Sequence, residues 1–180
     1  MSSEERIERE QRLRREVLRG IEDAWRSWYE EASPLLFAYV LWRCARLPQV
    51  AEEIAQETWL VAVRRIRSFD PTKGTFQNWL RGIAANLIRN YFRAQRNGAI
   101  SLNGQTPEAT SDHERAWHVA EALSELPDRY ESVLRAKYLE CWTVNEIADA
   151  WQETPKAIES LLTRARQAFR EAYQPEDENA

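Results

Sequence analysis

Residues 76–96 read FQNWLRGIAANLIRNYFRAQR, and this stretch decides the fold. Its apolar residues recur every three or four positions, which is the spacing of one face of an α-helix. They are Phe76, Trp79, Leu80, Ile83, Ala84, Leu87, Ile88 and Tyr91. The other side is polar and carries Asn78, Arg81, Asn86, Arg89, Asn90, Arg93 and Arg96. The pattern predicts a long helix with one face in a core and an arginine- and asparagine-rich face in water.

Similar periodicity extends along most of the chain. Only 5 Gly and 7 Pro interrupt its 180 residues, whereas Trp alone contributes 8, which is typical of a helical protein with aromatic cores. We expect further helices over residues 4–30, 34–47, 50–67, 114–126 and 128–140, with two more after Thr143 and Thr154. Ser33-Pro34 predicts the start of the second helix, and Asp70-Pro71 predicts a turn over 68–75. The expected fold class is all-α.

Composition shifts divide this all-α chain into two small helical domains joined by a flexible linker. Residues 97–113 lack periodicity and are rich in Gly, Ser, Thr and Asn, as expected of a linker. We therefore expect a helical N-terminal extension, a first domain, the linker, a second domain and an acidic tail. Their ranges are 1–29, 30–96, 97–113, 114–173 and 174–180.

Charge is segregated along the chain although the net charge is only −4. Residues 64–96 hold eight basic side chains against Asp70 alone, a net charge of +7, and residues 154–170 carry +3. Between them, residues 97–128 carry −5. Two basic segments separated by an acidic one are typical of polyanion binding at two places. Solvated helix faces are the alternative interpretation.

Several functional classes lack the residues they need. We find no GxxxxGK[ST], GxSxG or HExxH motif. The two histidines are poorly spaced for a shared metal, and Cys44 and Cys141, which we expect to be reduced and buried, lie far apart. We expect no enzyme activity, no metal and no cofactor. No apolar run is long enough to span a bilayer, and residues 1–16 lack the apolar core of a secretory signal, so we expect no membrane insertion and a cytoplasmic location.

Aromatic side chains are interleaved with arginines in the basic segment 64–96. Such surfaces suit unstacked bases of single-stranded nucleic acid. Trp79 and Tyr91 lie on the apolar stripe, so we interpret them as core residues. For Phe69 in the turn and Phe92 at the edge of the stripe, the sequence leaves both a core position and a base contact open. The 68–75 turn is where a base would be taken out of its stack.

The C-terminal segment has the pattern of a helix-turn-helix. Thr143 and Glu146 form a capping box, and Thr154-Pro155 is a strong helix start. The first turns of the second helix would face bases, and the later arginines would face phosphates. The base-facing candidates are Lys156, Ala157, Glu159, Ser160 and Thr163, and the phosphate-facing candidates are Arg164, Arg166 and Arg170.

These segments together resemble a known family. AEEIAQETW (51–59) and FDPTKGTFQNWLRGIAANL (69–87) resemble region 2 of bacterial sigma-70-type transcription initiation factors, and residues 122–171 resemble their region 4. The order of the regions and the missing middle domain are similar to the small extracytoplasmic-function (ECF) group. The resemblance implies a two-domain helical protein that binds core RNA polymerase and promoter DNA, and it leaves an anti-sigma protein open as a further partner.

The resemblance also implies roles for individual residues. The helix around AEEIAQETW would dock on core polymerase through Glu52, Glu53, Gln56 and Glu57. The turn and the helix after it would bind and melt the −10 element through Phe69, Lys73, Thr75, Asn78, Arg81, Asn86, Arg89, Asn90 and Arg93. The helix-turn-helix would read the −35 element through Thr154, Lys156, Ala157, Ser160, Thr163, Arg164 and Arg166.

The sequence departs from the family pattern at the helix-turn-helix. Gln152 stands where members usually have Gly, and the recognition helix carries Glu159 and Leu161 where they have more basic residues. Two alternatives therefore remain beside a sigma factor. One is a helix-turn-helix regulator that binds duplex DNA without polymerase, and the other is an adaptor that binds polymerase without melting DNA.

Overall fold

The computed structural model describes residues 3–96 and 111–173, and every regular element in these ranges is a helix. The all-α expectation is confirmed. The chain divides into two compact units, one formed by residues 1–41 and 46–99 and the other by residues 42–45 and 100–180. Each unit has a core of its own. The expected linker 97–113 lies outside the described residues up to 110, and so does the tail from residue 174.

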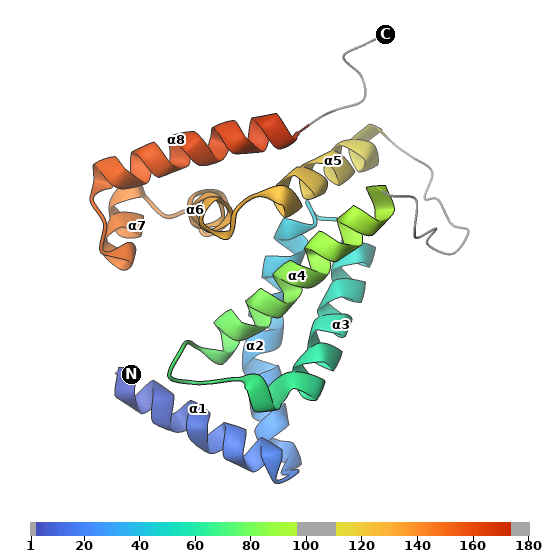
Figure 1. Ribbon diagram of the computed structural model, residues 1–180, viewed down its shortest axis with the longest axis vertical. Coiled ribbons are helices and arrows are strands. Elements are labelled where there is room, and N and C mark those ends of the chain that lie inside the picture. The colour runs from blue at the N-terminus through green and yellow to red at the C-terminus, as the bar shows by residue number, and fades with distance from the viewer. Residues whose placement is uncertain (1–2, 97–110, 174–180) are drawn as a thin grey trace. The chain divides into compact units, whose positions relative to one another are not determined.

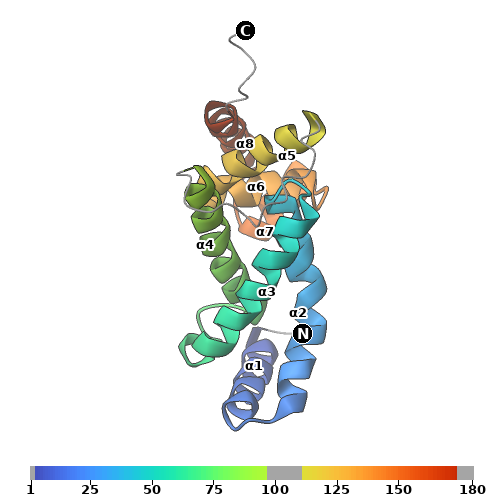
Figure 2. The same ribbon diagram turned by 90° about the vertical axis from the view of Figure 1, so that its right-hand side faces the viewer.

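The first unit is built on three long helices and a shorter one. These are α1 (Ser3–Leu18), α2 (Glu22–Arg43), α3 (Pro48–Arg65) and α4 (Phe76–Arg96), with a 3-10 turn η1 (Ile66–Ser68) after α3. Helices α2, α3 and α4 run alongside one another, and α1 crosses their end beside the loop from η1 to α4 (Figures 1 and 2). Leu36, Leu80 and Ile88 fill the bundle and are fully buried.

Aromatic packing holds the loop end of this bundle. The rings of Trp28 and Phe76 stack with their centroids 4.1 Å apart, and Phe69 meets both edge-on at 5.8 and 5.4 Å. All three side chains are at most 2% exposed. Because ring–ring contacts add to the burial of large apolar surfaces, this cluster fixes the start of α4.

The predicted helix boundaries in the N-terminal half are wrong at two places. Residues 4–30 do not form one helix, since α1 ends at Leu18 and Gly20 adopts a left-handed φ of +81°. The N–H of Ile21 donates to the carbonyl of Glu16 across this turn, as at helix ends that close on a glycine. Ile21 is therefore 44% exposed, whereas a single helix over residues 4–30 would place it on the same face as the buried Leu13 and Val17.

Ser33-Pro34 does not begin a helix, because Pro34 lies inside α2. The proline is exposed, whereas Ala32 and Leu36 on the inner side are buried. Continuous packing of the inner face compensates for the hydrogen bond that a proline ring removes. The helix ends at Arg43, before the predicted Leu47, and α3 starts at Pro48.

The second unit contains α5 (Ser111–Glu125), α6 (Asp128–Tyr138), α7 (Val144–Trp151) and α8 (Pro155–Ala172). Helix α8 packs against the other three, and its residues Ile158, Leu161 and Leu162 are buried. The break at Pro127 between α5 and α6, and the helices that begin after Thr143 and Thr154, agree with the sequence pattern. Cys141 was expected to be buried but is exposed, since it lies in the turn before α7 with a φ of 58°.

Candidate nucleic-acid and polymerase interfaces

The loop between η1 and α4 is a folded turn held by Asp70. Its carboxylate accepts hydrogen bonds from the N–H and hydroxyl of Thr72, at 3.1 and 2.7 Å, and lies 3.7 Å from the ammonium of Lys73. The hydrogen bonds from Thr72, with a smaller contribution from the charge of Lys73, lower the pKa of Asp70 below its ordinary value. The turn predicted from Asp-Pro is confirmed, and its carboxylate is ionised at neutral pH.

A hollow of about 250 Å³ opens between this turn and the first residues of α4. Four of the predicted −10 residues meet there, namely Phe69, Lys73, Thr75 and Asn78. Ser68, Asp70, Gly74 and Trp79 complete the lining. Phe69 lines the hollow on its inner side, because its ring is buried in the aromatic cluster with Phe76. The hollow has an aromatic floor and a polar rim, and its volume suits a small planar group such as one base.

An Asn- and Arg-bearing face of α4 continues from the hollow. Asn78, Asn86, Asn90 and Arg93 are exposed, and Arg89 is half-buried. Within this face Arg89 donates to Asn86 at 2.7 Å and Arg93 to Asn90 at 3.0 Å. Because these positions lie within about a third of a turn of one another, they form one surface, which we call the α4 polar face.

Arg81 is not part of the α4 polar face. Its guanidinium lies over the ring of Tyr39 on α2, 5.6 Å from the centroid, and the side chain is half-buried. A cation over an aromatic ring contributes to packing between helices. Tyr91 is buried as expected, Trp79 is half-buried, and Phe92, which the sequence left open, is 2% exposed.

The outer face of α3 combines acidic and apolar side chains. Glu52, Glu53 and Gln56 are exposed, and Glu57 is half-buried. Leu60 and Val63 lie on the same face of the helix and are 51% and 53% exposed. We call this set of six the α3 outer face. The sequence analysis missed Leu60 and Val63, although their spacing from Gln56, at four and seven residues, was a readable signal.

The helix-turn-helix has the caps that the sequence predicts. The hydroxyl of Thr143 accepts from the N–H of Glu146 at 3.2 Å, and the Glu146 carboxylate accepts from the N–H of Thr143 at 2.7 Å. The hydrogen bonds that the N–H and the hydroxyl of Thr143 donate to this carboxylate lower the pKa of Glu146. Thr154 caps α8 by accepting from the N–H of Ala157.

Gln152 supplies the left-handed residue between α7 and α8, with a φ of 55°. Its N–H donates to the carbonyl of Asp149, and that of Glu153 to Ala148. An ion pair of 2.7 Å between Arg129 and Glu153 ties this turn to α6. The turn therefore keeps its shape with a glutamine where glycine is the less strained residue.

The predicted −35 residues separate into two groups on α8. Lys156, Ser160, Thr163 and Arg164 are exposed on one face of the helix, close enough in angle to enter one groove. Thr154 is exposed at the cap and Ala157 is half-buried. Arg166 is turned toward α6, where its Nε–H donates to the hydroxyl of Tyr138 at 2.9 Å. Arg166 is thus held away from that face.

Two further features of the described ranges bear on the class of protein. Residues 3–96 and 111–173 contain no group of three His, Cys, Asp or Glu side chains that could hold a metal ion. No helix within these ranges is both long and apolar enough to cross a membrane. Two helical units, one with a polar face beside an aromatic-floored hollow and one with a helix-turn-helix, define a class of DNA-binding proteins.

Comparisons with known proteins give the family. The family models "Sigma-70 region 2" and "Sigma-70, region 4" match residues 28–98 and 118–169. RNA polymerase sigma factor CarQ of Myxococcus xanthus is 31% identical over 161 residues, or 84% of this chain and 90% of CarQ. ECF RNA polymerase sigma factor SigW of Bacillus subtilis is 30% identical over 67% of this chain and 73% of SigW. SigL of Mycobacterium tuberculosis, also an ECF sigma factor, is 27% identical over 81% and 86%. The chain belongs to the sigma-70 family of RNA polymerase sigma factors, in its ECF group.

Proposed function

We propose that this sigma factor directs core RNA polymerase to promoters with a division of labour among three surfaces. The α3 outer face contacts core polymerase, the α4 polar face and the adjoining hollow hold a parted −10 strand, and the exposed face of α8 reads the −35 element. The observation that carries the proposal is the continuity of the α4 polar face with the aromatic-floored hollow. A duplex-only regulator has no use for such a hollow.

The composition of the α3 outer face supports a protein partner. Exposed leucine and valine side chains beside glutamates are apolar enough to be buried by a partner and acidic enough to be repelled by DNA phosphates. Core RNA polymerase is the partner that the family implies. Leu60 and Val63 would supply apolar contact area, and Glu52, Glu53 and Gln56 would supply hydrogen bonds at its edge.

The −10 surface combines the elements that a single strand needs. The amides of Asn78, Asn86 and Asn90 can hydrogen-bond to base edges or to the sugar–phosphate backbone, and Arg89 and Arg93 add positive charge. A base that leaves the stack would enter the hollow above Phe69, with Thr75 and Asn78 at its rim. Arg81 would act through packing against α2 and not through DNA contact.

The −35 surface offers fewer contacts to DNA than the −10 surface. Lys156 and Ser160 lie in the first two turns of α8, where a recognition helix meets base edges, and Arg164 follows where phosphates lie. The nearby carboxylate of Glu159 is exposed and would oppose phosphates while accepting from a cytosine amino group. We therefore expect −35 contacts to contribute less to affinity than −10 contacts.

In vitro transcription with core polymerase on a genomic DNA library tests the proposal. We expect transcripts that start downstream of a shared two-part motif and that depend on the added protein. Binding to duplex DNA without core polymerase, together with no initiation, would support a helix-turn-helix regulator. Core binding without initiation would support an adaptor.

The remaining expectations follow from family membership as proposals. Transcription initiation factors act beside the polymerase, so we place the protein in the cytoplasm and assign it no catalytic step of its own. An anti-sigma protein stays a prediction, and the α3 outer face is a surface that such a partner would compete for.

A further inference from the structure

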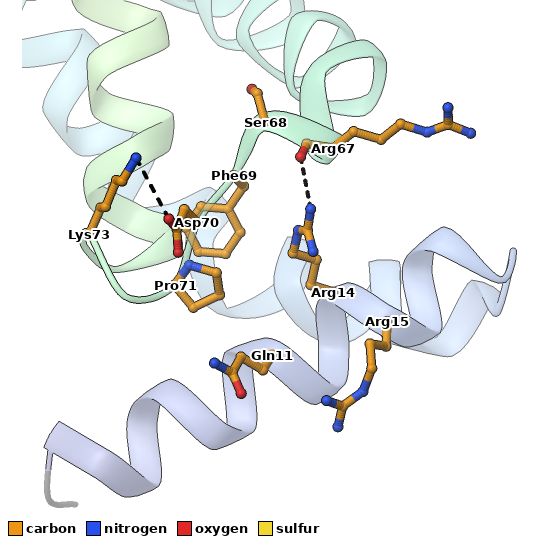
Figure 3. Close-up of a pocket in the computed structure, with 9 residues that line it drawn as sticks. All are labelled: Gln11, Arg14, Arg15, Arg67, Ser68, Phe69, Asp70, Pro71 and Lys73. Carbon is orange, nitrogen blue, oxygen red and sulfur yellow. Dashed lines mark hydrogen bonds and ion pairs between the residues drawn. The ribbon is translucent and has the colours of Figure 1, made fainter.

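A second and larger hollow lies between α1 and the start of the 68–75 turn. Its volume is about 500 Å³. Gln11, Arg14 and Arg15 of α1 form one wall, and residues from Arg67 to Lys73 form the other (Figure 3). Residues 28–98 match sigma-70 region 2, so α1 lies before the matched range.

Specific contacts hold α1 at this place. Arg14 donates through Nη2 to the carbonyl of Arg67 at 2.8 Å (Figure 3). One oxygen of Glu10 accepts from the N–H of Phe76 at 3.0 Å, and the other pairs with Arg6 at 2.9 Å. Leu13 and Val17 are buried beneath. Arg14 thus contacts the chain before the 68–75 turn, and Glu10 contacts the chain after it. Because both sides of the turn are bonded to α1, the helix and the turn form one structural element.

The hollow is strongly basic. Four cationic side chains, those of Arg14, Arg15, Arg67 and Lys73, line it against the single carboxylate of Asp70. Asp70 already accepts hydrogen bonds from Thr72. The Nε–H of Arg14 is buried and makes no hydrogen bond within the described part of the chain. Arginine is the side chain best shaped to hold a phosphate through several N–H groups.

Both hollows share part of their lining. Ser68, Phe69, Asp70 and Lys73 border the smaller one and the larger one alike. The two hollows therefore adjoin each other at the 68–75 turn. Arg15 and Arg67 are exposed and extend into solvent in Figure 3, so their side chains are free to turn toward a passing phosphate on a fast timescale.

We propose that α1 and residues 67–73 bind the sugar–phosphate backbone of the parted DNA strand, next to the nucleotide whose base occupies the smaller hollow. The inference rests on the −10 role proposed above and adds α1 to it. Four cations dominate the lining, and contacts to phosphates carry no sequence information, so we expect this contact to serve every promoter alike.

A matched pair of double variants tests this proposal. Arg15→Ala/Arg67→Ala removes two exposed cations from the hollow and leaves the Arg14 and Glu10 contacts in place. Arg12→Ala/Arg19→Ala removes two exposed cations from the same N-terminal region, outside the hollow. Each variant is assembled with core polymerase, and its affinity for a promoter template with a pre-opened −10 bubble is measured between 50 and 200 mM salt.

We expect Arg15→Ala/Arg67→Ala to weaken bubble binding and to lower the slope of log affinity against log salt by about 1.4, since each single-strand phosphate contributes about 0.7. The fully paired template and the Arg12→Ala/Arg19→Ala variant should show less than half of this change. The −10 motif found in transcription should be the same for both variants.

Three results would overturn the proposal. An unchanged salt slope on the bubble template shows that no phosphate lies in the hollow. An equal loss on paired and bubble templates shows a duplex contact instead. Stabilisation of the wild-type chain against heat by inorganic phosphate, lost in Arg15→Ala/Arg67→Ala while bubble binding stays intact, shows a site for a free anion.

A polymerase-free measurement separates this inference from the proposed function. The full-length chain and both variants are titrated with a single-stranded and a paired oligonucleotide of the same sequence. If the wild-type protein initiates no transcription, the proposed function fails. Selective loss of single-strand binding in Arg15→Ala/Arg67→Ala still supports the hollow as a strand-binding site in that case, and equal binding by both variants refutes it.

Discussion

At the scale of single residues, hydrogen bonds to short polar side chains determine where the functional helices begin. Thr143 and Thr154 cap α7 and α8, and Thr75 accepts from the N–H of Asn78 at the start of α4. Each cap satisfies an N–H group that has no partner within its own helix. The caps thus set the position at which α4, α7 and α8 begin, and with it the residues on each face of these helices.

We expect Thr143→Ala to lower the free energy of unfolding of the second unit by about 1 kcal/mol, the usual cost of losing an N-cap. Urea unfolding at pH 7 measures it. Glu159→Gln, an exposed substitution on α8, is the control and should stay near wild type.

The capping box also predicts a pH dependence. The pKa of Glu146 in the folded protein lies below its ordinary value of 4.5, so the ionised carboxylate favours folding above that pH, and this contribution is lost as the pH falls through the folded pKa. Glu146→Gln should therefore cost more stability at pH 7 than at pH 3. An equal cost at both pH values would show that the carboxylate charge plays no part.

At the scale of elements, α1 acts as a clamp on the turn before α4. Arg6 reaches the carbonyls of Pro71 and Gly74, each at 3.4 Å, and Glu10, which is 7% exposed, holds the first N–H of α4. A buried carboxylate between an arginine and a helix start satisfies both. The position of the 68–75 turn thus depends on a helix outside the range that matches region 2.

We expect Glu10→Ala to destabilise the first unit by about 1–3 kcal/mol, because it leaves the buried N–H of Phe76 without its acceptor and removes the counter-ion of Arg6. Hydrogen exchange should become faster over residues 70–78. Glu8→Ala removes an exposed carboxylate from the same helix and is the matched control. Unchanged exchange in that loop would mean that α1 does not restrain the turn.

At the scale of the whole molecule, the two surfaces for which we propose different partners differ in charge. The α3 outer face is acidic and partly apolar, whereas the α4 polar face carries arginines and asparagines. One surface repels DNA and the other attracts it. We propose that separation of the two surfaces lets one small protein contact polymerase and DNA at the same time.

A crossed pair of variants checks this separation. Gln56→Ala/Glu57→Lys should weaken binding to core polymerase in a pull-down, since it reverses a charge on the α3 outer face. Arg89→Ala/Arg93→Ala should leave core binding intact and reduce permanganate reactivity of the −10 region about tenfold, as expected for about 1.4 kcal/mol of lost strand affinity. Each variant is the control for the other, and identical defects in both would contradict the separation.

The sequence by itself determined the helical class, the extent of α4, the caps of α7 and α8 and the polar face of α4. These features depend on periodicity and on local hydrogen bonding, which are readable along one segment. The turn over 68–75 was equally local, because Asp70 bonds to Thr72 two residues away.

Only the tertiary structure decided the rest. Pro34 lies within a helix because packing on the inner face of α2 outweighs the local signal for a helix start at Ser33-Pro34. Arg81 and Arg166 are arginines like others on their helices, but they contact Tyr39 and Tyr138, which are distant in sequence, and so lie apart from the α4 polar face and the exposed face of α8. The clamp from Glu10 to Phe76 joins residues 66 positions apart. Contacts of this kind depend on how helices pack against one another, and no local pattern in the chain encodes them.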